Sequence, residues 1–150
     1  MPERGNHLKK EEVSIYQEIR KNTGMALAAL NTISDKIYDD TLAMQVARET
    51  LKYSDIRNRA TDRLLQGKAE PRRNSPFSKL MLKGGIQMNT ALNTSTSHIA
   101  ELLIQGSNRG IVDLYKTLNR CPDLRGPAME MAKELMDFEE KNIERLKKYL

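Results

Sequence analysis

Between residues 41 and 66, apolar side chains recur at every third or fourth position, so one face of a helix with 3.6 residues per turn is continuously apolar. The members of this stripe are Leu42, Val46, Tyr53, Ile56, Ala60 and Leu64. Glu49 falls in the middle of the same stripe and is its charged member. A stripe of this kind has to be buried against other elements, and it therefore predicts an amphipathic helix in a helical bundle.

Three further segments show the same periodicity, and together the four predict an all-α four-helix bundle in a single domain, residues 1–150. We expect helices over about 8–33, 39–66, 86–118 and 126–150. The stripes of the other three helices are Ile15, Ile19, Ala26, Leu30 and Ile33; Met88, Leu92, Ser95, Ile99, Leu102, Gly106, Leu114 and Leu118; and Ala128, Met131, Leu135, Phe138, Ile143, Leu146 and Leu150. On the first helix, Gly24 and the nearby alanines predict a thin section where another helix can approach closely.

Helix ends follow from capping residues. Asp39 or Asp40 can cap the second helix, Gly67 can end it, and Gly126 with Pro127 can begin the last one. The first two helices are joined by a few residues, which predicts antiparallel packing. Between the second and third, a helix that resumes at Pro76 leaves a short turn, whereas a break at Gly84–Gly85 leaves about 19 residues, which can span up to ~60 Å. The double glycine favours this longer connection, a crossover along the bundle.

Composition limits the class of protein. The chain has 150 residues, of which 39% are hydrophobic and 30% charged, as expected for a soluble bundle. No apolar run approaches the ~20 residues of a membrane span, so we expect no membrane partner. Cys121 is the only cysteine, which excludes an internal disulfide and predicts a cytoplasmic protein. Eight methionines and no tryptophan predict adaptable helix-to-helix contacts, including self-association into a homo-oligomer.

The formal net charge of +5 raises the question of a polyanionic partner. Basic residues are densest at the end of the second helix and beyond it: Arg57, Arg59, Arg63, Lys68, Arg72 and Arg73. Bases at a helix C-terminus are also favoured by the helix dipole, which makes a solvated helix end the simpler interpretation. Because no aromatic residues are interleaved for base stacking, nucleic acid is not the favoured partner.

Three segments, Glu18–Met25, His98–Gly106 and Phe138–Glu144, are similar to sequences of small uncharacterised bacterial proteins of the ferritin-like superfamily, and the similarity extends over nearly the whole chain. The resemblance implies a four-helix bundle with a crossover between two helical hairpins. In the metal-binding members, one helix of each hairpin supplies a Glu and the other a Glu-x-x-His pair, which together hold two iron or manganese ions.

On this chain, the resemblance implies Glu49, His98, Glu101 and Glu139 as candidate metal ligands. The match to the ligand pattern is incomplete, because Lys52 and Asn142 stand where the two histidines of the Glu-x-x-His pairs would be. On the first helix, Glu12 or Glu18 could serve as the remaining ligand.

Several polar positions have alternative interpretations. A buried Glu49 either accepts a hydrogen bond from Tyr16 or Tyr53 or pairs with a cation, or it holds a metal or transfers a proton. A rotated helix would instead leave Glu49 exposed. His98 and Glu101 lie one turn apart and either satisfy each other or share a metal. Gly106 and Gly110 permit close helix contact, or they line a ligand cavity.

No histidine–acid pair is placed to activate a hydroxyl group as a nucleophile, so no catalytic residue is assigned. We therefore expect a non-catalytic structural or interaction module that needs no cofactor. The alternatives are a ferritin-like metal protein, as an oxidoreductase or an iron or manganese store, and polyanion binding through the Arg57–Arg73 cluster.

Overall fold

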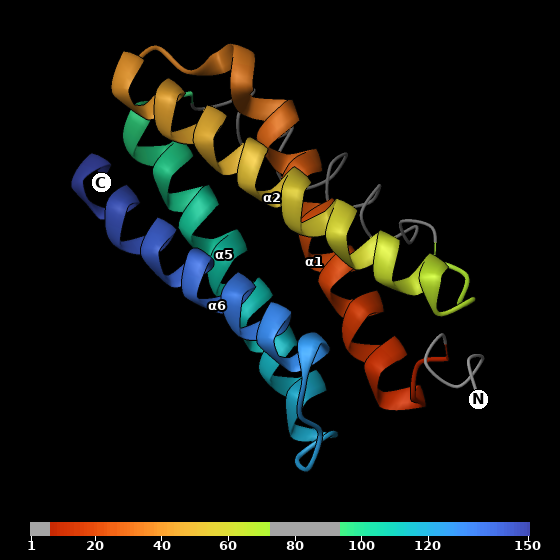
Figure 1. The fold of residues 1–150 in the computed structure, drawn as a ribbon. Helices are drawn as coiled ribbons and strands as arrows, with labels where there is room; N and C mark the ends of the chain where they lie inside the picture. Colours follow the sequence, from red (N-terminus) through yellow and green to blue (C-terminus); the bar gives the residue numbers. More distant parts are fainter. Residues whose placement is uncertain (1–6, 73–93) are drawn as a thin grey trace.

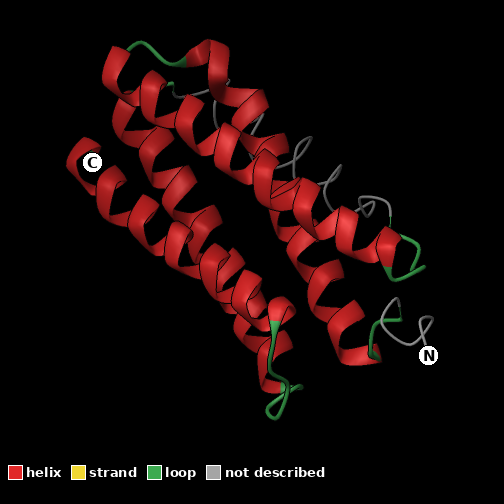
Figure 2. Cartoon of the chain, viewed as in Figure 1, coloured by secondary structure: helices red, strands yellow, loops and turns green. Residues whose placement is uncertain are grey.

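The computed structural model describes residues 7–72 and 94–150, which form a bundle of four long helices (Figures 1 and 2). These are α1 (Lys10–Ile33), α2 (Asp40–Gln66), α5 (Thr96–Asn119) and α6 (Pro127–Leu146), with short 3-10 turns η2 (Ser34–Lys36) and η4 (Lys147–Tyr149). The described residues contain no strand, which confirms the predicted all-α four-helix bundle. Within these residues, no helix is both long and apolar enough to cross a membrane.

Contacts between side chains fix the helix directions. Arg63 donates a hydrogen bond to the hydroxyl of Tyr16, which sets the end of α2 beside the beginning of α1. The hydroxyl of Thr117, near the end of α5, donates to Glu18 Oε1 on the same part of α1. Both α2 and α5 are therefore antiparallel to α1, and they run in the same direction (Figure 1).

A crossover connection requires these helix directions. The residues that join α2 to α5, including Pro76 and Gly84–Gly85 on which the two predicted connections depend, lie outside the described residues. The crossover itself stays a prediction.

Helix α2 begins and ends at the predicted capping residues, but Gly67 ends the helix for a different reason from the one expected. The carboxylate of Asp39 accepts the backbone N–H of Leu42 across 2.9 Å, as expected of an N-cap. Gly67 ends the helix at an ordinary φ of −82°, whereas Lys68 takes the left-handed conformation with a φ of 59°. A side chain at Gly67 would lie 2.5 Å from Leu8 Cγ, so the glycine serves the close approach of Leu8 and not the backbone turn.

Helix α5 begins at Thr96, and the prediction of a helix that continues through Thr94 and Ser95 is wrong. Ser95 is exposed, and its hydroxyl accepts the backbone N–H of His98 across 3.2 Å. The serine interpreted as part of the apolar stripe is therefore the N-cap, because a short hydroxyl side chain competes for backbone donors at a helix start. The predicted start at Ile86 lies outside the described residues.

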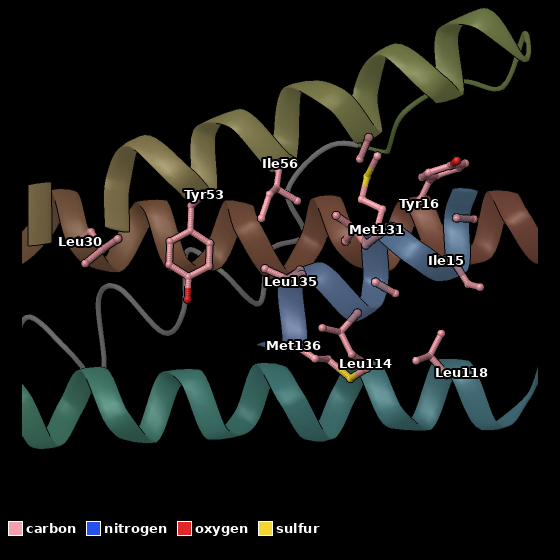
Figure 3. Close-up of a cluster of buried hydrophobic side chains, with 14 of the residues drawn as sticks. Ile15, Tyr16, Leu30, Tyr53, Ile56, Leu114, Leu118, Met131, Leu135 and Met136 are labelled. Carbon is pink, nitrogen blue, oxygen red and sulfur yellow. The ribbon is translucent and has the colours of Figure 1, made fainter. Parts of the chain in front are cut away.

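The apolar stripes meet in one core, as Figure 3 shows for part of it. All six apolar members of the α2 stripe are buried, and so is Glu49, with 2% of its surface exposed. On α6 the stripe is buried at Ala128, Met131, Leu135 and Leu146. Leu150, predicted to continue this stripe, lies beyond the end of α6 and is 62% exposed. Tyr53 projects from α2 toward the interior, with its hydroxyl pointing away from its own helix (Figure 3).

Two arginines of the basic cluster around the end of α2, Arg59 and Arg63, bind residues of other helices. Arg59 binds Glu134 of α6 with Nη1 and Nη2, at 3.1 and 2.5 Å, and Lys52 binds the same carboxylate at 2.9 Å. These cations hold the pKa of Glu134 down at about 2. The Arg59 guanidinium is thus used to join α2 to α6, and Arg73 lies outside the described residues.

One buried side chain of α1 holds the chain that leaves α2. The amide of Gln17 donates to the carbonyl of Glu70 at 2.8 Å and accepts the backbone N–H of Arg72 at 3.0 Å. Arg20 adds a hydrogen bond from its guanidinium to the carbonyl of Arg72. Residues 70–72 are therefore held against α1.

Candidate functional site

A cavity of about 270 Å³ lies inside the bundle beside the two buried carboxylates of Glu49 and Glu139. Most of its wall comes from α1 and α5, while α2 contributes Glu49 and Tyr53 and α6 contributes Glu139. The exposed lining residues belong to α1 and α5, so the mouth of the cavity lies between these two helices: Lys21, Gln105, Gly106 and Arg109. The apolar part of the wall consists of Met25, Ala26, Ala29, Leu30, Ile33, Leu102 and Leu103.

Glu139 is held by hydrogen bonds from two other helices. Asn22 of α1 donates to its Oε1 at 2.9 Å, and the Tyr53 hydroxyl donates to its Oε2 at 3.0 Å. Only 1% of the Glu139 surface is exposed. The carboxyl group is therefore fixed at the point where α1, α2 and α6 meet.

Glu49 is less completely bonded. Gln45, one turn earlier on α2, donates to its Oε2 at 3.0 Å. The described residues supply no hydrogen bond to its Oε1, although Glu49 is 98% buried and lines the cavity. Glu49 accepts a hydrogen bond as predicted, but the predicted donors are wrong. Gln45 is the donor, because Tyr16 binds Arg63 and Tyr53 binds Glu139.

Burial changes the acidity of this group of residues. Desolvation raises the pKa of Glu49 to about 7, against weaker opposing effects of Gln45 and Arg145. Desolvation also raises the pKa of Glu139 to about 7, where hydrogen bonds from Asn22 and Tyr53 oppose it and the charge of Glu49 adds to it. The same burial raises the pKa of Tyr53 well above its ordinary value. Near neutral pH the two carboxyl groups therefore titrate together inside the bundle.

The two glycines singled out on α5 differ in their surroundings. A Cβ at Gly110 would lie 2.7 Å from both Asn22 Nδ2 and Glu139 Oε2, so this glycine allows α5 to approach the buried carboxylate. A Cβ at Gly106 would meet nothing within 4 Å. Both glycines line the cavity, and both predicted roles, close contact and cavity lining, are therefore present in this pair.

The four candidate metal ligands are not brought together. Glu49 and Glu139 line the cavity, as described above. His98 and Glu101 lie in the first turns of α5 and pair with each other at 3.5 Å, and neither belongs to the cavity wall. Of the alternative ligands on α1, Glu18 lies in the cavity wall, and Glu12 instead accepts the backbone N–H of Lys9.

The residues around Glu49 and Glu139 do not fit a two-metal centre. Within the described ranges, no three His, Cys, Asp or Glu side chains are placed to hold a metal ion. Lys52, at one of the two histidine positions of the motif, binds Glu134. Asn142, at the other, is completely buried, and neither polar atom of its side chain has a hydrogen-bond partner among the described residues. Iron or manganese binding stays a prediction, and the site offers two carboxylates for it.

Three residues of the site were not predicted from the sequence: Asn22, Gln45 and Ser107. A signal for the first two was present, because Asn22 lies between Ile19 and Ala26 on the apolar stripe of α1 and Gln45 follows Leu42 at a stripe position of α2. A polar side chain at such a position is expected to have a buried partner. Ser107 directly follows Gly106 on α5, is buried, and hydrogen-bonds with Tyr53.

Comparisons with protein-family models, curated proteins and solved structures find no match for this chain.

Proposed function

We propose that this protein is a non-catalytic binding module that holds a small, largely apolar molecule in the cavity between α1 and α5. The observation that carries this proposal is the cavity itself, about 270 Å³ in volume, with a wall whose surface is mainly apolar. An apolar cavity of roughly 150 Å³ is sufficient to bind benzene. The sequence analysis expected a structural or interaction module without naming a partner, and this proposal specifies a small molecule as that partner.

The cavity exists because its wall carries small residues where a bundle could carry large ones. Ala26 and Ala29 of α1 and Gly106 of α5 all line it, and a Cβ at Gly106 would meet nothing within 4 Å. Protein interiors are normally close-packed, and a void of this size forfeits dispersion contacts. The thin section of α1 was predicted as a place for close helix contact, but its residues Ala26 and Ala29 line the cavity. Retaining that space costs stability, and a bound ligand would restore the lost contacts.

A direct test uses the neutral dye N-phenyl-1-naphthylamine, whose fluorescence rises in an apolar environment. We expect saturable binding at one site per chain. The substitution Ala29→Leu places a larger side chain in the cavity wall and should weaken dye binding at least tenfold. Ala47→Leu makes the same chemical change on the exposed face of α2, outside the cavity, and should leave the affinity unchanged.

Two results would contradict the proposal. One is the absence of saturable dye binding to the folded wild-type protein. The other is equal binding by the Ala29→Leu and Ala47→Leu proteins, which would place the dye elsewhere. Circular dichroism of both variants verifies that each one is folded.

The remaining expectations stay proposals. A ferritin-like relationship is supported by the parallel course of α2 and α5, and a metal role is supported only by the shared location of Glu49 and Glu139. Titration with Mn²⁺ and Fe²⁺, followed by elemental analysis, tests that role. Self-association is tested by sedimentation, polyanion binding by salt-dependent retention on DNA, and a cytoplasmic location by fractionation.

A further inference from the structure

We infer that the ligand of this cavity is an organic cation, a molecule with an apolar body and one ammonium group that binds between Glu49 and Glu139. This inference rests on the proposed function and specifies the chemical class of the ligand. Its support comes from the burial of the two carboxylates without a cationic partner among the described residues, from an unused acceptor on Glu49, and from the apolar side chains of the same wall.

The charged residues that line the cavity differ in burial and in pairing. The two cations of the wall, Lys21 and Arg109, are at the mouth and exposed, and both pair with Asp113, at 3.9 and 3.4 Å. Among the described residues, Glu49 and Glu139 form no ion pair with a Lys or Arg side chain, although the more distant charge of Arg145 acts on Glu49. A buried carboxylate without a counter-ion is costly. The inner end of the cavity therefore favours a positive charge.

Hydrogen bonding indicates the same kind of group. Each carboxylate oxygen can accept about two hydrogen bonds. Oε1 of Glu49 receives none from the described residues, and each oxygen of Glu139 receives one, from Asn22 or from Tyr53. An ammonium group carries three donors and no acceptor, so it could supply the missing donors to both carboxylates at once.

The apolar part of the wall limits the rest of the molecule. It consists of methyl, methylene and thioether groups, from residues such as Met25, Leu30 and Leu102. A polar body would lose its hydration there without receiving hydrogen bonds. The cavity therefore fits an amine with a short alkyl or aryl chain that extends toward α5.

Charge recognition of this kind depends on pH, and groups from all four helices contribute. Those that face the site are Glu18 and Lys21 on α1, Glu49 and Tyr53 on α2, Arg109 and Asp113 on α5, and Glu139 and Arg145 on α6. Because burial raises the pKa of Glu49 and Glu139, an incoming cation has to displace bound protons. Amine binding should therefore strengthen between pH 6 and pH 8, where the amine stays charged.

The experiment compares two ligands of nearly equal shape, 2-phenylethylamine and 2-phenylethanol, by calorimetry at pH 8. We expect the amine to bind at least about tenfold more tightly, as is typical when a neutral hydrogen bond is replaced by a charged one. The double substitution Glu49→Gln with Glu139→Gln keeps the shape of both side chains and should remove this preference, with the alcohol still bound. Glu140→Gln, on the exposed face of the same helix, should keep the preference.

The possible outcomes separate the inference from the proposed function. If the wild-type protein binds dye and alcohol but shows no preference for the amine, the ligand class is wrong and the cavity function stands. If it binds neither the dye nor either ligand, both fail. If the double variant does not fold, Glu49→Gln alone replaces it, and an undiminished preference in that variant would overturn the role of Glu49.

Discussion

Tyr53 of α2 donates its phenolic hydrogen to Oε2 of Glu139 on α6 across 3.0 Å, and this hydrogen bond joins residues 86 positions apart in the sequence. It lies in the interior, where Tyr53 is 2% exposed, and the ring of Phe138 packs edge-on against Tyr53 with centroids 5.0 Å apart. The hydrogen bond thus links α2 to α6 beside the cavity.

The substitution Tyr53→Phe removes this donor and leaves the ring in place. We expect a loss of about 1 to 2 kcal/mol in the free energy of unfolding, because a buried acceptor loses a partner. The pKa of Glu139 should rise further, since the Tyr53 hydrogen bond lowers it. Urea denaturation measures the first effect, and carbon-13 NMR of the carboxyl groups measures the second.

Tyr149→Phe is the matched control. Its hydroxyl donates to Thr41 at 2.9 Å near the surface, where water can replace the partner, and its loss should cost less than about 0.5 kcal/mol. Equal losses for the two variants would show that the buried hydrogen bond has no special weight.

The stability of the protein should fall as pH rises from 5 to 8.5. In the folded state the pKa of Glu49 and of Glu139 is raised from 4.5 to about 7, so the fold favours their protonated forms. The resulting stability is complete below pH 4.5 and is lost as pH rises through 7, by an upper bound on the order of 3 kcal/mol for each carboxyl group. Urea denaturation across this range measures the slope.

The double substitution Glu49→Gln with Glu139→Gln should flatten this dependence. A smaller slope should remain, because burial also raises the pKa of Glu18. Glu134, with its pKa lowered to about 2, loses its contribution as pH falls below 4.5 and therefore acts outside this window. A wild-type stability that rises between pH 5 and 8.5 would contradict the protonated forms inferred for Glu49 and Glu139.

The two glycines of α5 should respond in opposite directions to alanine. Gly106→Ala should stabilise the protein by up to about 1 kcal/mol, because alanine is the better helix former and the new methyl meets nothing within 4 Å. Gly110→Ala should destabilise it by about 1 to 2 kcal/mol, because the methyl would displace Asn22 and Glu139 from their hydrogen bond. Thermal denaturation of both variants measures the difference, and stabilisation by both would exclude the close approach at Gly110.

Asn142, which stands at one of the two histidine positions of the Glu-x-x-His motif, should lower the stability of the fold. Its side chain is completely buried, and neither of its polar atoms has a hydrogen-bond partner among the described residues. Asn142→Leu should stabilise the protein by about 1 to 3 kcal/mol, because an apolar side chain of similar size avoids the cost of burying an unpaired amide. The exposed Asn58→Leu is the control, with an expected change within about 0.5 kcal/mol. A large loss of stability in Asn142→Leu would indicate that the amide has a partner.

The helices and their buried faces were predictable from the sequence, because the spacing of residues such as Leu42, Ile56 and Leu64 depends only on the helical repeat. The burial of Glu49 followed from the same spacing. The pairing of Tyr53 with Glu139 was not predictable, because it depends on how far each helix is rotated and shifted against the others. Packing of whole surfaces sets that arrangement. For the same reason, His98 and Glu101 could not be excluded from the site until the course of α5 was known.

The double hydrogen bond of Gln17 has a consequence for how the first hairpin ends. A single amide of α1 engages both the carbonyl of Glu70 and the N–H of Arg72, in the way that a neighbouring strand would. The position of the chain just after the hairpin therefore depends on Gln17, a residue more than fifty positions earlier in the sequence. A helical pair grafted without Gln17 would keep only the hydrogen bond from Arg20 to the carbonyl of Arg72 to hold this segment against α1.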